Sequence, residues 1–328
     1  MDVSSVFSSE TTNYIPSEAK GITAWVRWRL IVIHFSMFSV SCIIGFLRTI
    51  CGIFHRRWKA KDLSGKVALV TGGANGLGRY ICLRLAYEQC KIAVVDINLQ
   101  EAEQTANDLR GMGATAIAYK VDAANFESIA SLRDEIHRDF GRVDILINNV
   151  GLIGLLTLMR ATQEQIEQMV AVNVTSVMLA TKLFLKDMVQ QGEGHIVAIS
   201  SSFGLTPSST TVYGTTLFAI RGFMACLNQE ILINNWEDKI KTTCAFPFYM
   251  ATRKELTDYT ENLNLKGKMF LISPTDAADA IVKGIKWERR NVAIPSGFYF
   301  LMIFMGTFTS NIIRRFYRMA FGRSANFP

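Results

Sequence analysis

The sequence predicts a protein of the α/β class, built on a doubly wound parallel sheet, with an apolar helix before this domain and an apolar segment after it. Three observations support the prediction. Short runs rich in Val, Ile and Ala alternate with helix-like stretches, a glycine-rich turn follows the first run, and a long uncharged stretch lies near the N-terminus. Strands of a parallel sheet are covered on both faces by the connecting helices, so they are apolar throughout.

The first element, over 23–50, is predicted to anchor the chain in a membrane, after a polar tail over 1–22. Its uncharged run, the 18 residues 30–47, is just long enough for a helix to cross a bilayer. Tryptophans stand on both sides of this run, as is typical of membrane interfaces: Trp25, Trp28 and Trp58. A helix or re-entrant hairpin in one leaflet is the alternative. A signal peptide fits less well, because a basic cluster follows the run in place of a small-residue cleavage site.

The distribution of charge supports the membrane and gives the orientation. The chain carries a net charge of +7, yet residues 67–290 hold 22 Lys and Arg against 24 Asp and Glu, so the excess lies at the two ends. Basic residues beside apolar segments favour a membrane surface, whereas a nucleic-acid-binding protein carries them on its folded domain. We therefore expect a membrane partner and no nucleic acid. The basic linker over 51–61 is the heavier flank, which places the main domain, 62–290, in the cytosol.

Six strands are predicted in the main domain, with helices between them. The apolar runs are 67–72, 91–96, 116–122, 143–149, 195–200 and 241–247. This alternation implies parallel strands joined by helical crossovers. A hydrophobic content of 49% with 19% charged residues excludes a disordered chain. The six cysteines form no C-x-x-C pair and there are only four histidines, so no metal site is predicted.

The first predicted strand leads into a glycine-rich turn that is typical of a dinucleotide site. The turn contains Thr71, Gly72, Gly76, Leu77 and Gly78. Glycines let the backbone approach a pyrophosphate, and the N-terminus of the following helix supplies N–H donors and the positive end of its dipole. The turn therefore predicts a Rossmann-type domain that binds a dinucleotide.

Asp96 ends the next strand, 18 residues after Gly78. A carboxylate at this place accepts hydrogen bonds from the adenosine ribose and repels a 2′-phosphate. Asn75, which precedes the second glycine of the turn, is not basic either. Both residues favour NAD over NADP as the cofactor. The alternative for Asp96 is a helix N-cap or a turn residue.

The spacing T-G-x-x-x-G-x-G over 71–78 resembles the short-chain dehydrogenase/reductase superfamily, and later segments do so in the right order. The segment 148–151 is similar to the N-N-A-G segment of that family, with Val150 in place of alanine, and Phe248 replaces a glycine of the Pro-Gly-x-x-x-Thr loop. The resemblance covers residues 62–290. It implies a nicotinamide cofactor and further cofactor contacts from Asp122, Asn149, Gly151, Pro247 and Thr252.

The same resemblance implies a catalytic tyrosine, a serine that holds the substrate oxygen, and an asparagine of the active site. Tyr213, Ser201 and Asn173 match these positions, with Ser200 and Ser202 as alternatives to Ser201. The family places a lysine four residues after the tyrosine, on the same helix face. Its charge favours the phenolate, and its amine binds the nicotinamide ribose.

Leu217 occupies the position of that lysine. A tyrosine with an ordinary pKa of about 10 is a poor base at neutral pH, and leucine supplies no charge to lower that pKa. The resemblance therefore predicts an impaired chemical step and weaker, retained NAD binding. Arg221 lies one turn further along and points back towards Leu217, so its guanidinium is an alternative cation. A solvated surface charge is the other interpretation of Arg221.

Within the superfamily, the chain resembles the membrane-anchored retinol and 17β-hydroxysteroid dehydrogenases, in its apolar ends and in the stretches 194–204 and 239–248. This resemblance implies a lipophilic alcohol or ketone as the substrate, a homodimer, and residence on the endoplasmic reticulum or lipid droplets. Two functions follow as alternatives. One is a slow NAD(P)-dependent oxidoreductase, and the other is an NAD-binding protein without catalysis that has a scaffolding or lipid-droplet role. A membrane protein without nucleotide is disfavoured, because the glycine-rich turn and Asp96 are retained.

The last segment, 291–328, is expected to associate with the membrane. Residues 291–313 carry no charge, and three arginines follow within five residues. Proline and glycine interrupt the uncharged run at Pro295, Gly297 and Gly306. We therefore expect an apolar surface that dips into the membrane interface, without a second span. A core helix of the main domain is the alternative.

Overall fold

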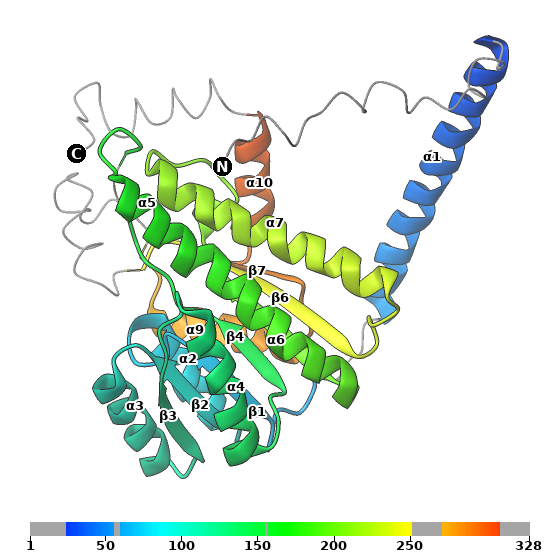
Figure 1. Ribbon diagram of the computed structural model, residues 1–328. Coiled ribbons are helices and arrows are strands. Elements are labelled where there is room, and N and C mark those ends of the chain that lie inside the picture. Colours follow the sequence, from blue (N-terminus) through cyan, green and yellow to red (C-terminus); the bar gives the residue numbers. More distant parts are fainter. Residues whose placement is uncertain (1–23, 56–59, 155–156, 251–270, 309–328) are drawn as a thin grey trace, which may run out of the picture. The chain divides into compact units, whose positions relative to one another are not determined.

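The computed structural model describes residues 24–55, 60–154, 157–250 and 271–308 (Figure 1). The chain divides into two compact units, Met1–Lys59 and Ala60–Pro328. In the part of the chain that the structure describes, the first unit is one helix and the second is an α/β domain. The predicted fold class is confirmed.

The first unit contains α1 (Ala24–His55), which covers the uncharged run. Its 32 residues extend about 48 Å, more than the roughly 30 Å of a bilayer's hydrocarbon core. Large apolar side chains along the helix are exposed, among them Ile31, Phe35, Met37, Val40 and Ile43. Two polar side chains are satisfied within the helix, as a membrane requires. His34 Nδ1 lies 2.7 Å from the Leu30 carbonyl oxygen, and Ser39 Oγ donates to the carbonyl four residues earlier (2.8 Å).

The second unit is built on a seven-stranded parallel sheet with the order β3-β2-β1-β4-β5-β6-β7. The strands are β1 (Val67–Thr71), β2 (Lys91–Asp96), β3 (Ala116–Lys120), β4 (Ile145–Asn148), β5 (Gly194–Ile199), β6 (Ile240–Pro247) and β7 (Asn291–Ile294). All six predicted strands are present. The order reverses at β1, with β2 on one side and β4 on the other. In doubly wound sheets ligands bind at this point, beyond the carboxyl ends of the strands.

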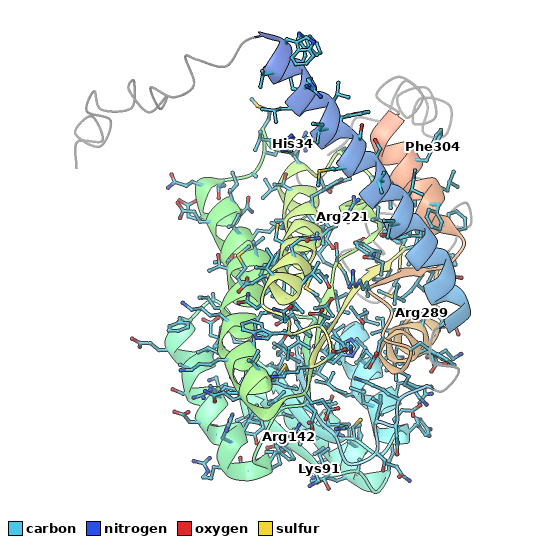
Figure 2. The ribbon with its side chains drawn as sticks, turned by 90° about the vertical axis from the view of Figure 1, so that its right-hand side faces the viewer. His34, Lys91, Arg142, Arg221, Arg289 and Phe304 are labelled. Carbon is cyan, nitrogen blue, oxygen red and sulfur yellow. The ribbon has the colours of Figure 1, made fainter. Side chains whose placement is uncertain are left out.

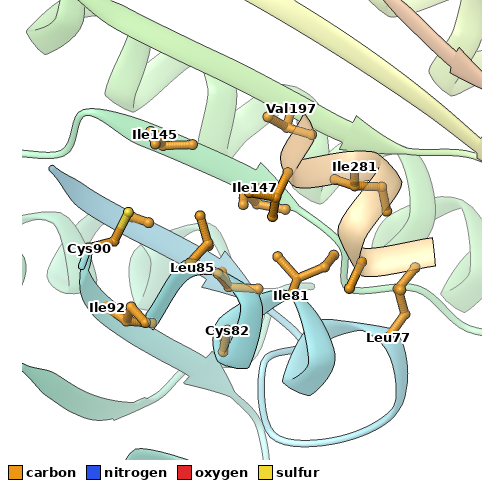
Figure 3. Close-up of a cluster of buried hydrophobic side chains, with 14 of the residues drawn as sticks. Leu77, Ile81, Cys82, Leu85, Cys90, Ile92, Ile145, Ile147, Val197 and Ile281 are labelled. Carbon is orange, nitrogen blue, oxygen red and sulfur yellow. The ribbon is translucent and has the colours of Figure 1, made fainter. Parts of the chain in front are cut away.

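Helices cover both faces of the sheet (Figure 1). One face carries α2 (Gly76–Tyr87), α3 (Leu99–Gly111) and α9 (Pro274–Lys286), and the other carries α4 (Phe126–Phe140), α6 (Ser176–Gln191) and α7 (Thr211–Ile233). Alternate residues of a strand serve the two faces, so that Val70 packs on the first and Leu69 on the second. Figure 3 shows the first cluster, where Ile81 of α2 lies beside Ile281 of α9.

Two stretches of the second unit are long and apolar enough to cross a membrane by length and composition, Gln163–Gln191 and Thr211–Ile233. They include α6 and α7, which pack on the second face of the sheet. A buried core helix passes the same test, and we interpret both as core helices. The first of them begins with α5 (Gln163–Val170), which a Thr162 capping box starts, and contains the π turn η4 (Ala171–Thr175).

The sequence did not predict β7, which lies in the segment expected to associate with a membrane. The strand pairs with β6 from Cys244–Asn291 to Pro247–Ile294, and its Val292 and Ile294 are buried. The sheet therefore extends past residue 290, where the main domain was expected to end. A four-residue apolar strand that begins a longer uncharged run has no periodicity that distinguishes it from a membrane segment.

The helix that follows, α10 (Phe298–Phe308), has a buried side and an exposed side. Met302 is buried, and Tyr299 packs partly against the second cluster. Phe300 exposes 81% of its surface and Leu301 exposes 49%. One side of α10 is thus buried, as expected for a core helix of the main domain. Its other side exposes apolar surface, as expected for a segment that contacts a membrane. Residues 309–328 lie outside the described residues.

A buried chain of hydrogen bonds joins the start of the second unit to the sheet. His195 in β5 is fully buried; its Nδ1 lies 3.1 Å from Lys61 Nζ and its Nε2 lies 2.8 Å from Thr243 Oγ1. Thr243 donates in turn to the carbonyl oxygen of Arg289 (2.8 Å), which is labelled in Figure 2. This direction of donation fits a neutral imidazole that carries its proton on Nε2. Burial, followed by the charges of Lys61 and Lys241, holds the pKa of His195 well below its ordinary value.

We expect the free energy of unfolding to fall as the pH is lowered from about 6.5 towards 5, by up to about 1.4 kcal/mol per pH unit. In this window the unfolded chain binds a proton at His195 that the folded chain does not bind. Urea unfolding of His195→Gln should show lower stability at pH 7.5 and a flatter dependence between pH 6.5 and 5. His137→Gln, which removes a half-exposed histidine next to Asp187, is the control and should keep most of the slope. An unchanged slope in His195→Gln would contradict the assignment.

Candidate dinucleotide site and active site

The glycine-rich turn connects the carboxyl end of β1 to the N-terminus of α2 with a backbone that only glycine adopts easily. Gly72 and Gly76 have φ values of +63° and +53°. Gly78 packs so closely on the turn that a Cβ atom there would overlap the Gly72 carbonyl oxygen. Asn75 caps α2, since its Oδ1 accepts the Gly76 N–H at 2.7 Å. At Gly76 nothing lies within 4 Å of an added Cβ, so the turn is open there to an approaching group.

Hydrogen bonds from the end of β4 clamp this turn. Thr71 Oγ1 accepts the N–H groups of Asn149 (3.0 Å) and Val150 (3.2 Å). Asn149 Nδ2 donates to the carbonyl oxygens of Thr71 (3.0 Å) and Gly72 (3.1 Å). On the other side, Thr105 Oγ1 of α3 donates to the Ala74 carbonyl oxygen (2.9 Å). The turn is therefore fixed between two central strands and α3.

Asp96 lies at the end of β2, next to the turn. Its Oδ2 accepts the Ala74 N–H (3.2 Å), and its Oδ1 accepts the Asn98 N–H (3.1 Å). The N-cap of α3 is Asn98, so Asp96 is not the cap, although it supports the loop before that helix. A cavity of about 220 Å³ opens beside it, lined by Thr71, Gly72, Asp96, Asp122 and Val150 together with apolar side chains of α4 and α6. The structure thus brings these candidate cofactor residues together.

The remaining candidate cofactor residues have different surroundings. Leu77 is buried in the first core cluster and acts as a packing residue. A Cβ on Gly151 would approach Asn173 Oδ1 at 3.6 Å, which places Gly151 beside this candidate catalytic residue. Pro247 ends β6, and its carbonyl oxygen accepts from Ser201 Oγ (3.3 Å). Thr252 lies outside the described residues.

Asn173 is held in the π turn η4, a break in helix geometry that is frequent at functional sites. Its Oδ1 accepts the Leu152 N–H (2.7 Å), and its Nδ2 donates to the Leu152 carbonyl oxygen (3.0 Å). Nδ2 also donates to Thr216 Oγ1 (3.1 Å) on α7, and Thr216 donates to the Tyr213 carbonyl oxygen (2.7 Å). Asn173 and Tyr213 are therefore joined through Thr216, a residue that the sequence analysis did not single out.

The three serines after β5 have different roles. Ser200 is buried, and its Oγ donates to the Leu217 carbonyl oxygen (3.0 Å). Ser202 is buried as well. Ser201 is half-buried, caps the short helix η5 (Ser202–Gly204) and directs its Oγ to Pro247. Of the three, Ser201 is the least buried, and its catalytic role remains a prediction.

Leu217 exposes only 6% of its surface and packs in the interior behind Tyr213 on α7. Arg221, labelled in Figure 2, donates from Nη1 to the Gly204 carbonyl oxygen (3.4 Å). Its charge acts on Cys244 and Tyr299, whose pKa values burial raises and Arg221 lowers. The guanidinium is therefore directed to η5, β6 and α10. Gly204 itself packs against the Leu217 carbonyl, so Arg221 is not a fully solvated charge, and its role as the alternative cation stays a prediction.

The turn and its neighbours fit a nicotinamide dinucleotide. The open turn at Gly76 and the N-terminus of α2 suit a pyrophosphate, and Asp96 suits ribose hydroxyls. Within the described ranges, no group of three or more His, Cys, Asp or Glu could hold a metal ion. Sequence reasoning missed Thr105, Thr216 and Leu152, because their roles depend on partners 21 to 43 residues away.

Comparisons with known proteins agree with this arrangement. A family model described as short chain dehydrogenase matches residues 66–262. Estradiol 17-beta-dehydrogenase 11 of Homo sapiens is 30% identical over 244 residues, which cover 74% of this chain and 79% of that protein. The 17-beta-hydroxysteroid dehydrogenase 13 of Homo sapiens is 27% identical over 268 residues, 81% of this chain and 86% of that protein.

Solved structures are similar as well. A short chain dehydrogenase/reductase from Burkholderia phymatum in complex with NAD has a TM-score of 0.66 and 22% identity, and the match covers 74% of this chain and 93% of that chain. At this identity the likeness concerns the fold alone. The resemblance that the sequence motifs indicated is confirmed.

We expect Gly78→Ala to destabilise the domain by about 1–3 kcal/mol and to weaken NAD binding at least tenfold, because the added Cβ displaces the Gly72 carbonyl. Chemical unfolding and a titration with NAD measure the two effects. Gly222→Ala in α7 is the matched control: the added Cβ meets nothing within 4 Å, so stability should rise by about 0.5–1 kcal/mol and binding should not change. Wild-type NAD affinity in Gly78→Ala would argue against the turn as the binding site.

Proposed function

The chain belongs to the short chain dehydrogenase family, and from that premise we propose that it is a membrane-attached, NAD-binding oxidoreductase that interconverts lipophilic alcohols and ketones slowly. The observation that carries this proposal is the glycine-rich turn, which hydrogen bonds from Asn149 hold in place. The helix α7 carries Tyr213 but no lysine, which supports a slow reaction. Relatives named as estradiol and 17-beta-hydroxysteroid dehydrogenases support a lipophilic substrate.

The preference for NAD rests on Asp96 at the end of β2. Its carboxylate, held by the Ala74 N–H, offers acceptors to ribose hydroxyls and repels the 2′-phosphate of NADP. The family's cofactor accepts or supplies the hydride. The residues of this chain would bind it through the turn and the α2 N-terminus, and Ser201 and Tyr213 would act on the substrate.

The proton step is where this chain is weak. Ser201 would hold the substrate oxygen, and Tyr213 would take the hydroxyl proton when an alcohol is oxidised. A phenol needs a nearby cation for this, and a buried leucine at 217 supplies none. Each unit by which a pKa is misplaced corresponds to about 1.4 kcal/mol, or a factor of ten. We therefore propose a rate far below that of an enzyme with the lysine.

A second candidate function is binding of NAD without turnover, in a scaffolding or lipid-droplet role. The hydrogen bonds around Leu217 favour this second candidate. The side-chain amide of Asn173 donates to Thr216 Oγ1, and the Arg221 guanidinium donates to the Gly204 carbonyl oxygen. In this alternative, the nucleotide stabilises the folded domain by mass action and undergoes no chemistry.

Membrane attachment through α1, with the α/β domain in the cytosol, is part of the proposal. Exposed apolar side chains along α1 and the exposed Phe300 of α10 support it, as does the basic linker after the uncharged run. We propose the endoplasmic reticulum or lipid droplets as the site of residence, and a homodimer as the working form.

We expect Leu217→Lys to raise turnover of retinol or steroid alcohols with NAD at least tenfold, because an ammonium one turn from Tyr213 favours the phenolate. Turnover is followed as NADH absorbance. Leu217→Met is the size-matched control without charge and should give no gain, and thermal unfolding checks that each variant is folded.

Tyr213→Phe separates the two candidate functions. Wild-type turnover that Tyr213→Phe abolishes supports the slow oxidoreductase, whereas bound NAD with no Tyr213-dependent turnover supports the second candidate. Arg221→Ala tests the remaining cation and should leave NAD affinity and turnover unchanged. Equal turnover in the wild type and in Leu217→Lys would show that the missing lysine does not limit the reaction.

We expect Val40→Arg to release a measurable fraction of the protein from membranes, because a cation near the middle of the uncharged run costs about 2.5–3.5 kcal/mol. Flotation on liposomes measures the bound fraction. Met159→Arg is the matched control, since Met159 is 93% exposed on the α/β domain. Equal flotation of both variants would contradict insertion of α1.

A further inference from the structure

The N-terminal end of α3 faces the glycine-rich turn with a second carboxylate. Glu101 lies in the first turn of α3, where the Asn98 cap accepts its N–H (3.3 Å). Its Oε2 accepts from Asn75 Nδ2 at 3.3 Å. The oxygen of the same side-chain amide, Oδ1, accepts the Gly76 N–H at the start of α2. The Asn75 amide therefore holds Glu101 beside the turn.

Asp96 and Glu101 contact adjacent residues of the turn. Asp96 accepts the Ala74 N–H, and Glu101 accepts the Asn75 side-chain amide. Both acceptor side chains are partly or fully exposed, so their charges act on a ligand through solvent. The adenosine side of the turn therefore carries two negative charges, one from the end of β2 and one from the start of α3.

The nearby cation of α2 is already neutralised. Arg79 Nη2 pairs with Asp108 Oδ2 of α3 at 2.6 Å. Asp108 is itself braced, since its Oδ1 accepts from Gln104 Nε2 (3.0 Å). The guanidinium is held against α3 by this pair. Among the described residues, Asp96 and Glu101 are therefore the carboxylates of this cluster that form no ion pair.

We propose that Glu101, positioned by Asn75, is a second determinant of cofactor choice that disfavours the 2′-phosphate of NADP. The inference rests on the proposed NAD site and adds a residue to it. A phosphate monoester carries nearly two negative charges at neutral pH, whereas the ribose hydroxyl of NAD carries none. Repulsion by one carboxylate through solvent weakens NADP binding by roughly three- to tenfold and leaves NAD binding unchanged.

The test is the binding of NAD and of NADP to the full-length protein in detergent, by calorimetry. Glu101→Gln removes the charge and keeps an oxygen that accepts from Asn75. It should tighten NADP binding by roughly three- to tenfold at low salt, with NAD binding unchanged, and the gain should shrink at high salt. Glu103→Gln is the matched control: it removes the same charge two residues further along α3, where Glu103 pairs with Arg110, and should change neither affinity.

The outcomes separate this inference from the proposed function. An NADP-to-NAD affinity ratio that is the same in Glu101→Gln as in the wild type overturns the role of Glu101 and leaves the dinucleotide site intact. A gain of equal size in Glu103→Gln also overturns it, because the effect is then one of net charge. Absence of binding of either nucleotide to the wild type overturns the proposed function and the inference with it.

Discussion

The hydrogen bonds that Thr71 and Asn149 exchange across the ends of β1 and β4 are the constraint on which the whole site depends. These strands are neighbours in the sheet, although the chain between them forms β2 and β3 and their helices. Each side chain binds the other segment's backbone, so the glycine-rich turn has one position relative to the strand ends. Asp96, Asn173 and the start of α7 are placed around that fixed point by the sheet and its helices.

Local signals were enough for most of the fold, and for half of the site. Apolar runs marked six strands, and glycine spacing marked the turn, because both are properties of neighbouring residues. The strand β7 was missed, since it completes the sheet only by pairing with β6, whose partner residues lie 47 positions earlier. Motif spacing alone left Ser200 as an alternative to Ser201 for the catalytic serine. The structure distinguishes the two, because the hydroxyl of Ser200 is buried in a hydrogen bond to the Leu217 carbonyl oxygen. Thr216 gave no signal, because its role is a bond to Asn173, 43 residues away.

At Leu217 the contacts that hold helix α7 in place do not depend on the side chain that the proposed chemistry would need. Ser200 holds the backbone at 217 through a carbonyl oxygen, which any residue provides, and Thr216 connects the helix to η4. The position therefore keeps its geometry when the side chain loses its charge. The buried surroundings suit an apolar group there, whereas the proton transfer proposed for Tyr213 would need a cation. Leu217 meets the first requirement and not the second.

The first face of the sheet has a consequence for the order in which the chain is made. Its core combines Leu77 and Ile81 of α2 with Ile281 of α9, and ion pairs from Arg84 to Asp279 (2.6 Å) and from Glu88 to Lys286 (2.7 Å) join the two helices. Until α9 leaves the ribosome, about 200 residues after α2, the part of that face which α9 covers stays exposed for about 10–40 s at 5–20 residues per second. The nascent domain therefore exposes apolar surface late in its synthesis, long after its N-terminal helix has emerged.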